Sequence, residues 1–290
     1  MITERRTWRP AQAIFDSAHR GLFVALIGVV ILATPFVGMA TGSPPDPSEA
    51  TADTGEVLRL GVRVREVLPH DSGAFTQGLL WSEGRLYEST GEYGKSSVRR
   101  VDPETGTIEQ QASLPADLFG EGLAQVGDRL VQLTWRRGIA LVYDLESFEE
   151  IDRYSYQGEG WGLCNDGYRL YMSNGTATLS LRDHDSFEEL DRLQVTLEGR
   201  PVGALNELEC AEGWIYANVY QTDIIVRIDP HNGEVRAVID AAGLLSPEER
   251  AAADVLNGIA YRGDRSSFLL TGKYWPSMFE VDFTPREFRP

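Results

Sequence analysis

One carboxyl group stands among amide and aromatic side chains in a motif that the chain repeats five times. The motif is a polar or aromatic residue, in most copies a glycine, and then leucine or isoleucine. Its first positions are Gln77, Glu121, Trp161, Asn206 and Asn257. Glu121 is the one ionisable member of this first set. A carboxyl group among amides and an indole loses hydration, which raises its pKa toward the range useful for proton transfer. The pattern therefore predicts acid–base chemistry centred on Glu121.

A second set of residues lies five positions after the next apolar anchor of each copy. Trp135 and Tyr220 are equivalent in this register, Lys273 takes the same place in the fifth copy, and Gly91 and Gly175 complete the set. The two sets together indicate a narrow pocket with aromatic walls, one acid, one cation and several amides, which suits a small polar ligand or a chain terminus. Two plainer interpretations stay open. The first set can face trapped water beside closely packed glycines, and the aromatic residues can belong to the core.

The spacing of the motif predicts the elements that carry these residues. Successive copies lie 44, 40, 45 and 51 residues apart, and each contains short apolar segments separated by Gly, Asp and Pro. A period in the forties with several strands per repeat is typical of propeller blades. We therefore expect an all-β fold, a five-bladed β-propeller of four-stranded antiparallel blades. Because the first strand of each blade lines the central channel, the first set should form a ring around the axis.

Local patterns refine this expectation. In the first copy, alternation and turn residues predict strands at 75–81, 86–90, 96–101 and 107–112. One short helix is expected at 246–253, where Ser, Pro and two Glu residues form a helix start before the fifth blade. The fifth copy ends without a fourth strand, so residues 57–67 are expected to supply it and close the ring.

The first 56 residues read as a targeting region. Residues 1–20 are basic, and residues 21–40 are apolar enough for a transmembrane anchor or a signal peptide cleaved near Ala40. We favour the anchor because a long leader precedes the apolar run. Residues 41–56 resemble a flexible linker, and 57–290 form the propeller. The propeller is then exported, to the cell envelope or the periplasmic face, and the membrane contacts only the N-terminal helix.

Charge and cysteine content limit the partners. The chain has a formal net charge of −17, and an acidic body repels phosphate backbones, so nucleic acid is not expected as a partner. We expect a monomer. Cys164 and Cys210 lie one and two positions after the leucine of the third and fourth copies, which points them to opposite faces of equivalent strands. Two buried free thiols are therefore expected, rather than a disulfide.

Motifs in every repeat make the sequence similar to one known family. The matching segments are 75–79, 87–99, 119–123, 132–135, 158–163, 205–209, 256–260 and 271–273. Across about residues 58–283 they resemble the plant-type glutaminyl-peptide cyclotransferases, which include bacterial members. The resemblance implies a five-bladed propeller, unrelated to the zinc-dependent animal enzymes, that converts N-terminal Gln to pyroglutamate with release of ammonia.

The resemblance also implies roles for individual residues. The family's catalytic acid corresponds to Glu121, and its pocket corresponds to Phe75, Gln77, Phe119, Trp135, Trp161, Asn206 and Lys273. One position departs from the family pattern. The relatives usually carry Trp where this chain has Tyr220, which keeps an aromatic wall but shortens it.

The chemistry required by such a reaction agrees with these residues. The α-amine of the substrate attacks its own γ-carboxamide, and Glu121 can remove a proton from the amine and deliver one to the departing ammonia. Donors for the developing oxyanion would be Gln77, Asn206, Trp161 and Lys273. The reaction requires no cofactor and no metal. Its substrates are expected to be peptides or exported proteins that begin with Gln.

Two other classes of function stay open at this point. A metal-dependent hydrolase of the lactonase type would hold Ca²⁺ between Glu121, Asn206 and Asn257, but one carboxylate is a poor charge count for that ion and Lys273 would oppose it. A propeller that only binds exported proteins or peptidoglycan-type ligands is the other. Turnover of a Gln-initiated dipeptide in EDTA distinguishes all three.

Overall fold

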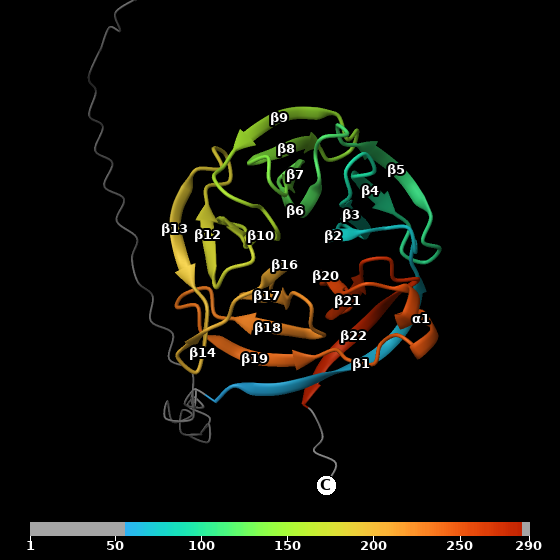
Figure 1. The fold of residues 1–290 in the computed structure, drawn as a ribbon, viewed down its shortest axis with the longest axis vertical. Coiled ribbons are helices and arrows are strands. Elements are labelled where there is room, and N and C mark those ends of the chain that lie inside the picture. Colours follow the sequence, from blue (N-terminus) through green and yellow to red (C-terminus); the bar gives the residue numbers. More distant parts are fainter. Residues whose placement is uncertain (1–55, 286–290) are drawn as a thin grey trace, which may run out of the picture. The chain divides into compact units, whose positions relative to one another are not determined.

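A computed structural model describes residues 56–285 of the chain. They form a five-bladed β-propeller, and Figure 1 shows the blades around a central axis with β2, β6, β10, β16 and β20 innermost. Blade 1 contains β2 (Thr76–Ser82), β3 (Arg85–Thr90), β4 (Ser97–Val101) and β5 (Ile108–Ser113). Blade 2 contains β6 (Gly120–Val126), β7 (Arg129–Thr134), β8 (Ile139–Asp144) and β9 (Glu150–Ser155). Blade 3 contains β10 (Leu163–Asn165), β11 (Leu170–Met172), β12 (Thr178–Arg182) and β13 (Glu189–Gln194).

The last two blades share one sheet. Blade 4 contains β16 (Leu205–Ala211), β17 (Trp214–Val219), β18 (Ile224–Ile228) and β19 (Val235–Asp240). Blade 5 contains β20 (Leu256–Arg262), β21 (Ser267–Gly272) and β22 (Ser277–Pro285). Its outer strand is β1 (Leu58–Pro69), which pairs antiparallel with β22 and, at its start, parallel with β19. The expected closure by residues 57–67 is confirmed, and β1 also joins blades 4 and 5 into one eight-stranded sheet. A two-stranded hairpin, β14 (Thr196–Leu197) and β15 (Arg200–Pro201), was not expected.

The predicted helix is also present, as α1 (Pro247–Ala252) between blades 4 and 5. Ser246 caps it, because its side chain accepts a hydrogen bond from the Glu249 N–H. The Glu249 side chain in turn accepts one from the Ser246 N–H. This reciprocal pair satisfies two backbone donors that would otherwise have no partner within the helix. The local sequence therefore accounts for where the helix begins.

The hydrophobic core lies between neighbouring blades. Between blades 2 and 3, for example, Val131 and Val142 pack with Leu163 and Leu170, and all four side chains are buried. Each such side chain contributes about 1.5–3 kcal/mol when it leaves water. The close packing explains the glycine of the motif, because a Cβ on Gly122 would lie 2.5 Å from the Leu163 nitrogen.

The fourth copy of the motif replaces this glycine with Glu207. Its carboxylate is buried and accepts hydrogen bonds from the backbone N–H groups of Leu79 (3.2 Å) and Ile259 (2.9 Å). Blade 4 thus reaches both blade 1 and blade 5 through a single side chain. Near the axis, Glu207 therefore joins inner strands of different blades by hydrogen bonds, whereas the glycine of the other copies lets neighbouring inner strands pack closely.

The prediction of two free thiols is wrong, since Cys164 and Cys210 form a disulfide. Cys164 lies on β10 and Cys210 on β16, which are equivalent strands of adjacent blades. The two side chains do point to opposite faces of their strands. Each blade, however, packs one face against the preceding blade and the other face against the following blade. Cys164 therefore points from blade 3 toward blade 4, and Cys210 points from blade 4 back toward blade 3. The disulfide links blade 3 to blade 4.

Removal of this link should destabilise the fold. We expect the double variant Cys164→Ala with Cys210→Ala to lose about 2–4 kcal/mol of unfolding free energy, because the disulfide closes a loop of 46 residues in the unfolded chain. Urea unfolding of the oxidised protein and of the variant measures the loss, and the wild-type protein in reductant should match the variant. Equal midpoints for all three samples would show that the disulfide contributes nothing.

The N-terminal predictions lie outside the described residues. These are the basic segment 1–20, the apolar segment 21–40 and the linker up to residue 55. Within residues 56–285, no helix is long and apolar enough to cross a membrane.

Candidate active site

A cavity of about 200 Å³ opens near the propeller axis and gathers nine of the ten residues singled out in the sequence. It is lined by Phe75, Gln77, Phe119, Glu121, Trp135, Trp161, Asn206, Tyr220 and Lys273. Larger hollows lie elsewhere, among them one of about 800 Å³ at the opposite ends of the inner strands. The small cavity is the better candidate because its aromatic walls enclose a buried acid and a buried cation.

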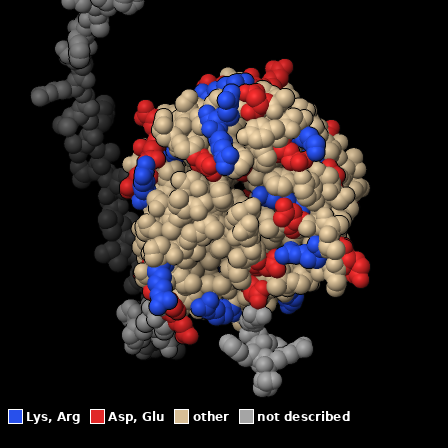
Figure 2. Space-filling view, viewed as in Figure 1, with Lys and Arg blue, Asp and Glu red and all other residues tan. Residues whose placement is uncertain are grey.

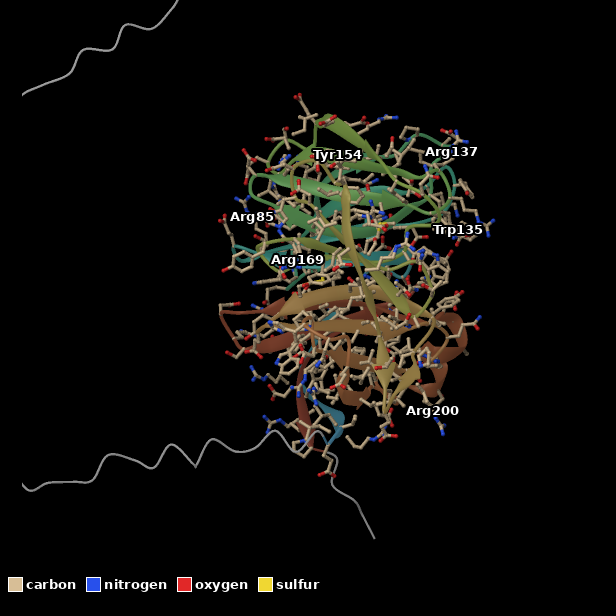
Figure 3. The ribbon with its side chains drawn as sticks, turned by 90° about the vertical axis from the view of Figure 1, so that its left-hand side faces the viewer. Arg85, Trp135, Arg137, Tyr154, Arg169 and Arg200 are labelled. Carbon is tan, nitrogen blue, oxygen red and sulfur yellow. A yellow bond between two sulfur atoms is a disulfide. The ribbon has the colours of Figure 1, made fainter. Side chains whose placement is uncertain are left out.

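The cavity lies toward one face of the propeller. Figure 3 views the propeller from its side and shows Trp135 and Arg137 toward one face, with Arg85 and Arg169 toward the opposite face. Figure 2 views the face that carries Trp135. Uncharged surface covers β16–β18, whereas charged side chains lie over the other blades, some of them near the centre of the face. The approach to the cavity over blade 4 is therefore largely uncharged.

The fold sets the position of each lining residue. Gln77, Glu121 and Asn206 lie on the innermost strands of blades 1, 2 and 4, and Trp161 lies two residues before β10. Hydrogen bonds tie these strands from blade to blade. The Ser89 hydroxyl donates to the carbonyl oxygen of Glu121, and Ser173 Oγ donates to that of Asn206 at 2.6 Å.

The second set follows the second strand of each blade, as its register predicted. Trp135 follows β7, Tyr220 follows β17 and Lys273 follows β21. The two glycines of this set make room for aromatic rings. A Cβ on Gly91 would lie 2.3 Å from the Phe119 ring, and one on Gly175 would lie 2.7 Å from the Trp161 ring.

Glu121 is buried, and its carboxylate has no hydrogen-bond partner among residues 56–285. Burial raises the pKa of Glu121 well above its ordinary value. The positive charge of Lys273 opposes this shift and the negative charge of Glu159 adds to it. Such a carboxyl group holds a proton more readily than an ordinary glutamate and faces the cavity, which are the properties of a general acid–base group.

Lys273 is a buried cation inside an aromatic cage. Its Nζ lies 4.5 Å from the centre of the Phe75 ring and 5.2 Å from that of Tyr220. Burial lowers the pKa of Lys273, while Glu121 and Asp254 partly offset that effect. Within the described part of the chain its ammonium group makes no hydrogen bond and no ion pair within 4 Å. Its donors are therefore available to a substrate.

The amides of the first set divide into two kinds. The Asn206 side-chain amide lines the cavity and makes no hydrogen bond to another residue of the described range. Asn257, by contrast, is fully buried beneath Gln77 and does not line the cavity. Its Nδ2 donates to Gln77 Oε1 at 3.1 Å and to the Thr76 carbonyl oxygen at 3.0 Å. Asn257 therefore orients the Gln77 amide so that the Gln77 N–H groups can donate to a ligand.

Sequence reasoning missed Glu159, which borders the cavity from outside. Its Oε2 accepts hydrogen bonds from the indole N–H groups of Trp135 (2.8 Å) and Trp161 (3.0 Å). The segment Gly158-Glu159-Gly160 directly before Trp161 is the one signal that could have indicated it.

Glu121 and Glu207 are both buried carboxyl groups with raised pKa values, and burial is the main cause for each. Their surroundings differ. Glu207 is satisfied by two backbone N–H groups and does not line the cavity, whereas Glu121 faces it. Of these two, Glu121 is the group placed to exchange a proton with a ligand.

Three comparisons with known proteins agree with one another. The family model for glutamine cyclotransferases matches residues 37–283. The chain is 40% identical, over 239 residues, to the glutaminyl-peptide cyclotransferase of Arabidopsis thaliana, which covers 79% of this chain and 74% of the relative. The crystal structure of Myxococcus xanthus glutaminyl cyclase superimposes with a TM-score of 0.73 at 36% identity, covering 80% of this chain and all of that one.

Proposed function

The chain belongs to the glutamine cyclotransferase family, and we propose that Glu121 carries the proton transfers of its reaction. The enzyme is a glutaminyl-peptide cyclotransferase, which converts N-terminal glutaminyl residues to pyroglutamate and releases ammonia. The observation that supports the role of Glu121 is its unpartnered carboxylate, buried in the wall of the small cavity that Lys273 also lines.

The reaction is intramolecular and balances without a further reactant. The α-amine nitrogen of the substrate forms a bond to its γ-carbonyl carbon, and the bond from that carbon to the amide nitrogen breaks. Glu121 accepts a proton from the attacking amine and delivers it to the departing nitrogen, which leaves as ammonia. The carboxylate ends the cycle in its initial state.

The other lining residues supply geometry and charge. A glutaminyl side chain must fold back on its own amine, and a cavity of about 200 Å³ with aromatic walls selects that compact conformation. Negative charge on the γ-carbonyl oxygen needs donors already in place. Lys273 Nζ and the Gln77 N–H groups are free to provide them. Asn206 is placed to bind the amide or amine groups of the substrate.

Tyr220 forms one wall of this cavity. Its ring packs edge-on against Trp161 at 5.5 Å, and its hydroxyl makes no hydrogen bond to Glu121 or Lys273. Tyr220→Phe should therefore leave kcat and KM within about twofold. Tyr220→Trp should lower KM, most for substrates with a bulky second residue, and keep kcat within a few-fold, because wall contacts stabilise ground and transition states alike. Steady-state kinetics on both variants decide this. A tenfold fall in kcat for Tyr220→Phe at unchanged KM would instead give the phenol a catalytic role.

The assay for the function uses the full-length protein and a Gln-initiated dipeptide. We expect stoichiometric ammonia and a product lighter by the mass of ammonia, with undiminished rates after exhaustive chelation by EDTA. Activity that is lost in EDTA and restored by Ca²⁺ or Zn²⁺ would require a metal-dependent mechanism. Failure to cyclise any Gln-initiated peptide would refute the function.

We also propose that the enzyme acts outside the cytoplasm on exported proteins. The supporting observations are the basic and apolar N-terminal sequence and the Cys164–Cys210 disulfide, since disulfides persist mainly in oxidising compartments. Separation of membrane and soluble fractions, followed by N-terminal sequencing, tests whether residues 21–40 remain as an anchor.

A further inference from the structure

We propose that Glu159 is a positioning residue that holds the indole rings of Trp135 and Trp161 in place as walls of the cavity. The inference rests on the cyclotransferase function proposed above, because those walls are the ones that enclose the folded glutaminyl side chain.

One oxygen of this carboxylate accepts hydrogen bonds from both tryptophans. Glu159 Oε2 accepts from Trp135 Nε1 at 2.8 Å and from Trp161 Nε1 at 3.0 Å. The two indoles come from different blades, Trp135 after β7 of blade 2 and Trp161 before β10 of blade 3. A single acceptor therefore fixes the orientation of two walls relative to each other. Hydrogen bonds to a charged acceptor are stronger than neutral ones, and two of them converge here.

Arg136 holds the carboxylate from the solvent side. Its Nε donates to Glu159 Oε1 at 3.1 Å, and its guanidinium group stacks over the Trp135 ring at 3.6 Å from the ring centre. Burial by itself would raise the pKa of Glu159, but the two indole hydrogen bonds and the pair with Arg136 outweigh it and lower the pKa, so Glu159 is ionised throughout the neutral range. Carboxylate, guanidinium and indoles thus form one connected unit at the rim.

The charge of Glu159 also reaches the acid–base group. Three titratable groups interact electrostatically with Glu121: Lys273 lowers its pKa, Glu159 raises it, and the buried Tyr156 stays neutral, with a pKa raised to about 12. Neutralising Glu159 should therefore lower the pKa of Glu121. The carboxylate form of Glu121 would then persist to a lower pH, and the acidic limb of the pH–activity profile would also move to lower pH. A residue that only maintained the fold would not move this limb.

Two variants separate the effect of the charge of Glu159 from the effect of its side-chain length. Glu159→Gln removes the charged acceptor, so we expect KM for a Gln-initiated peptide to rise about tenfold, kcat to stay within about threefold, and the acidic limb of kcat/KM to move to lower pH. Glu159→Asp keeps the charge but is too short to serve both indoles. It should raise KM and leave the limb unmoved.

Asp117→Asn is the matched control, since Asp117 forms a neighbouring exposed ion pair with Arg137 and does not touch the cavity. We expect wild-type kinetics from it. If Glu159→Gln does not fold, Arg136→Ala leaves the carboxylate in place without its outer support and should still raise KM. Wild-type KM and an unmoved acidic limb in folded Glu159→Gln, or wild-type KM in Arg136→Ala, would overturn the proposal. A wild-type protein without cyclase activity would instead overturn the function on which it rests.

Discussion

Glu121→Gln should lower kcat by at least about 10²-fold while KM and thermal stability stay close to wild type. Glutamine has nearly the same shape as glutamate, so the cavity keeps its volume and its walls. It cannot accept the amine proton, however, and no other carboxyl group of residues 56–285 lines the cavity. Stopped assays of ammonia release, with circular dichroism as a check on folding, measure the loss.

Glu207→Gln provides the matched control for that prediction. Glu207 is also a buried carboxyl group with a raised pKa, but it binds backbone N–H groups at the axis and does not face the cavity. We expect this variant to affect stability and to keep kcat within a few-fold. Comparable losses of kcat in both variants would mean that burial alone, and not contact with the substrate, explains the effect of Glu121→Gln.

Lys273→Met should lower kcat by about 10²-fold, the usual loss when one oxyanion donor is removed. Methionine keeps an apolar stem between the Phe75 and Tyr220 rings, so the cage should stay closed. The chain's other lysine, Lys95, is exposed and paired with Glu92, and Lys95→Met serves as the control with unchanged kinetics. A Lys273→Met enzyme with near-normal kcat and a raised KM would assign the ammonium group to binding alone.

Much of this architecture follows from the sequence because the repeat expresses it directly. The motif marks the innermost strand of every blade, and a fixed count from the next apolar anchor identifies Trp135, Tyr220 and Lys273, which all line the cavity. The count succeeds because equivalent positions of equivalent blades face the same axis. The helix start at Ser246 was visible for a different reason, since capping is a local property of a few residues.

The remaining features depend on how blades meet, which a repeat does not encode. The prediction of free thiols is wrong because it compares the faces of two equivalent strands, whereas the disulfide depends on which faces of two adjacent blades pack together. Asn257 shares the register of Gln77 but lies beneath it, as the two amides bond to each other. Glu159 acts from a loop outside the motif, and only the approach of two indoles from different blades gives it a role.

The most direct test of Glu121 as the proton-transfer group is the pH dependence of kcat/KM in the wild-type protein, Lys273→Met and Glu159→Gln. Because Glu121 must begin as a carboxylate, activity should fall as pH drops through its raised pKa, well above the ordinary value for glutamate. Removing the cation in Lys273→Met should move this acidic limb to higher pH, and removing the anion in Glu159→Gln should move it to lower pH. Opposite shifts with the same substrate are the predicted result. An acidic limb that stays in place in both variants, or moves the same way in both, would contradict Glu121 as the group that transfers the proton.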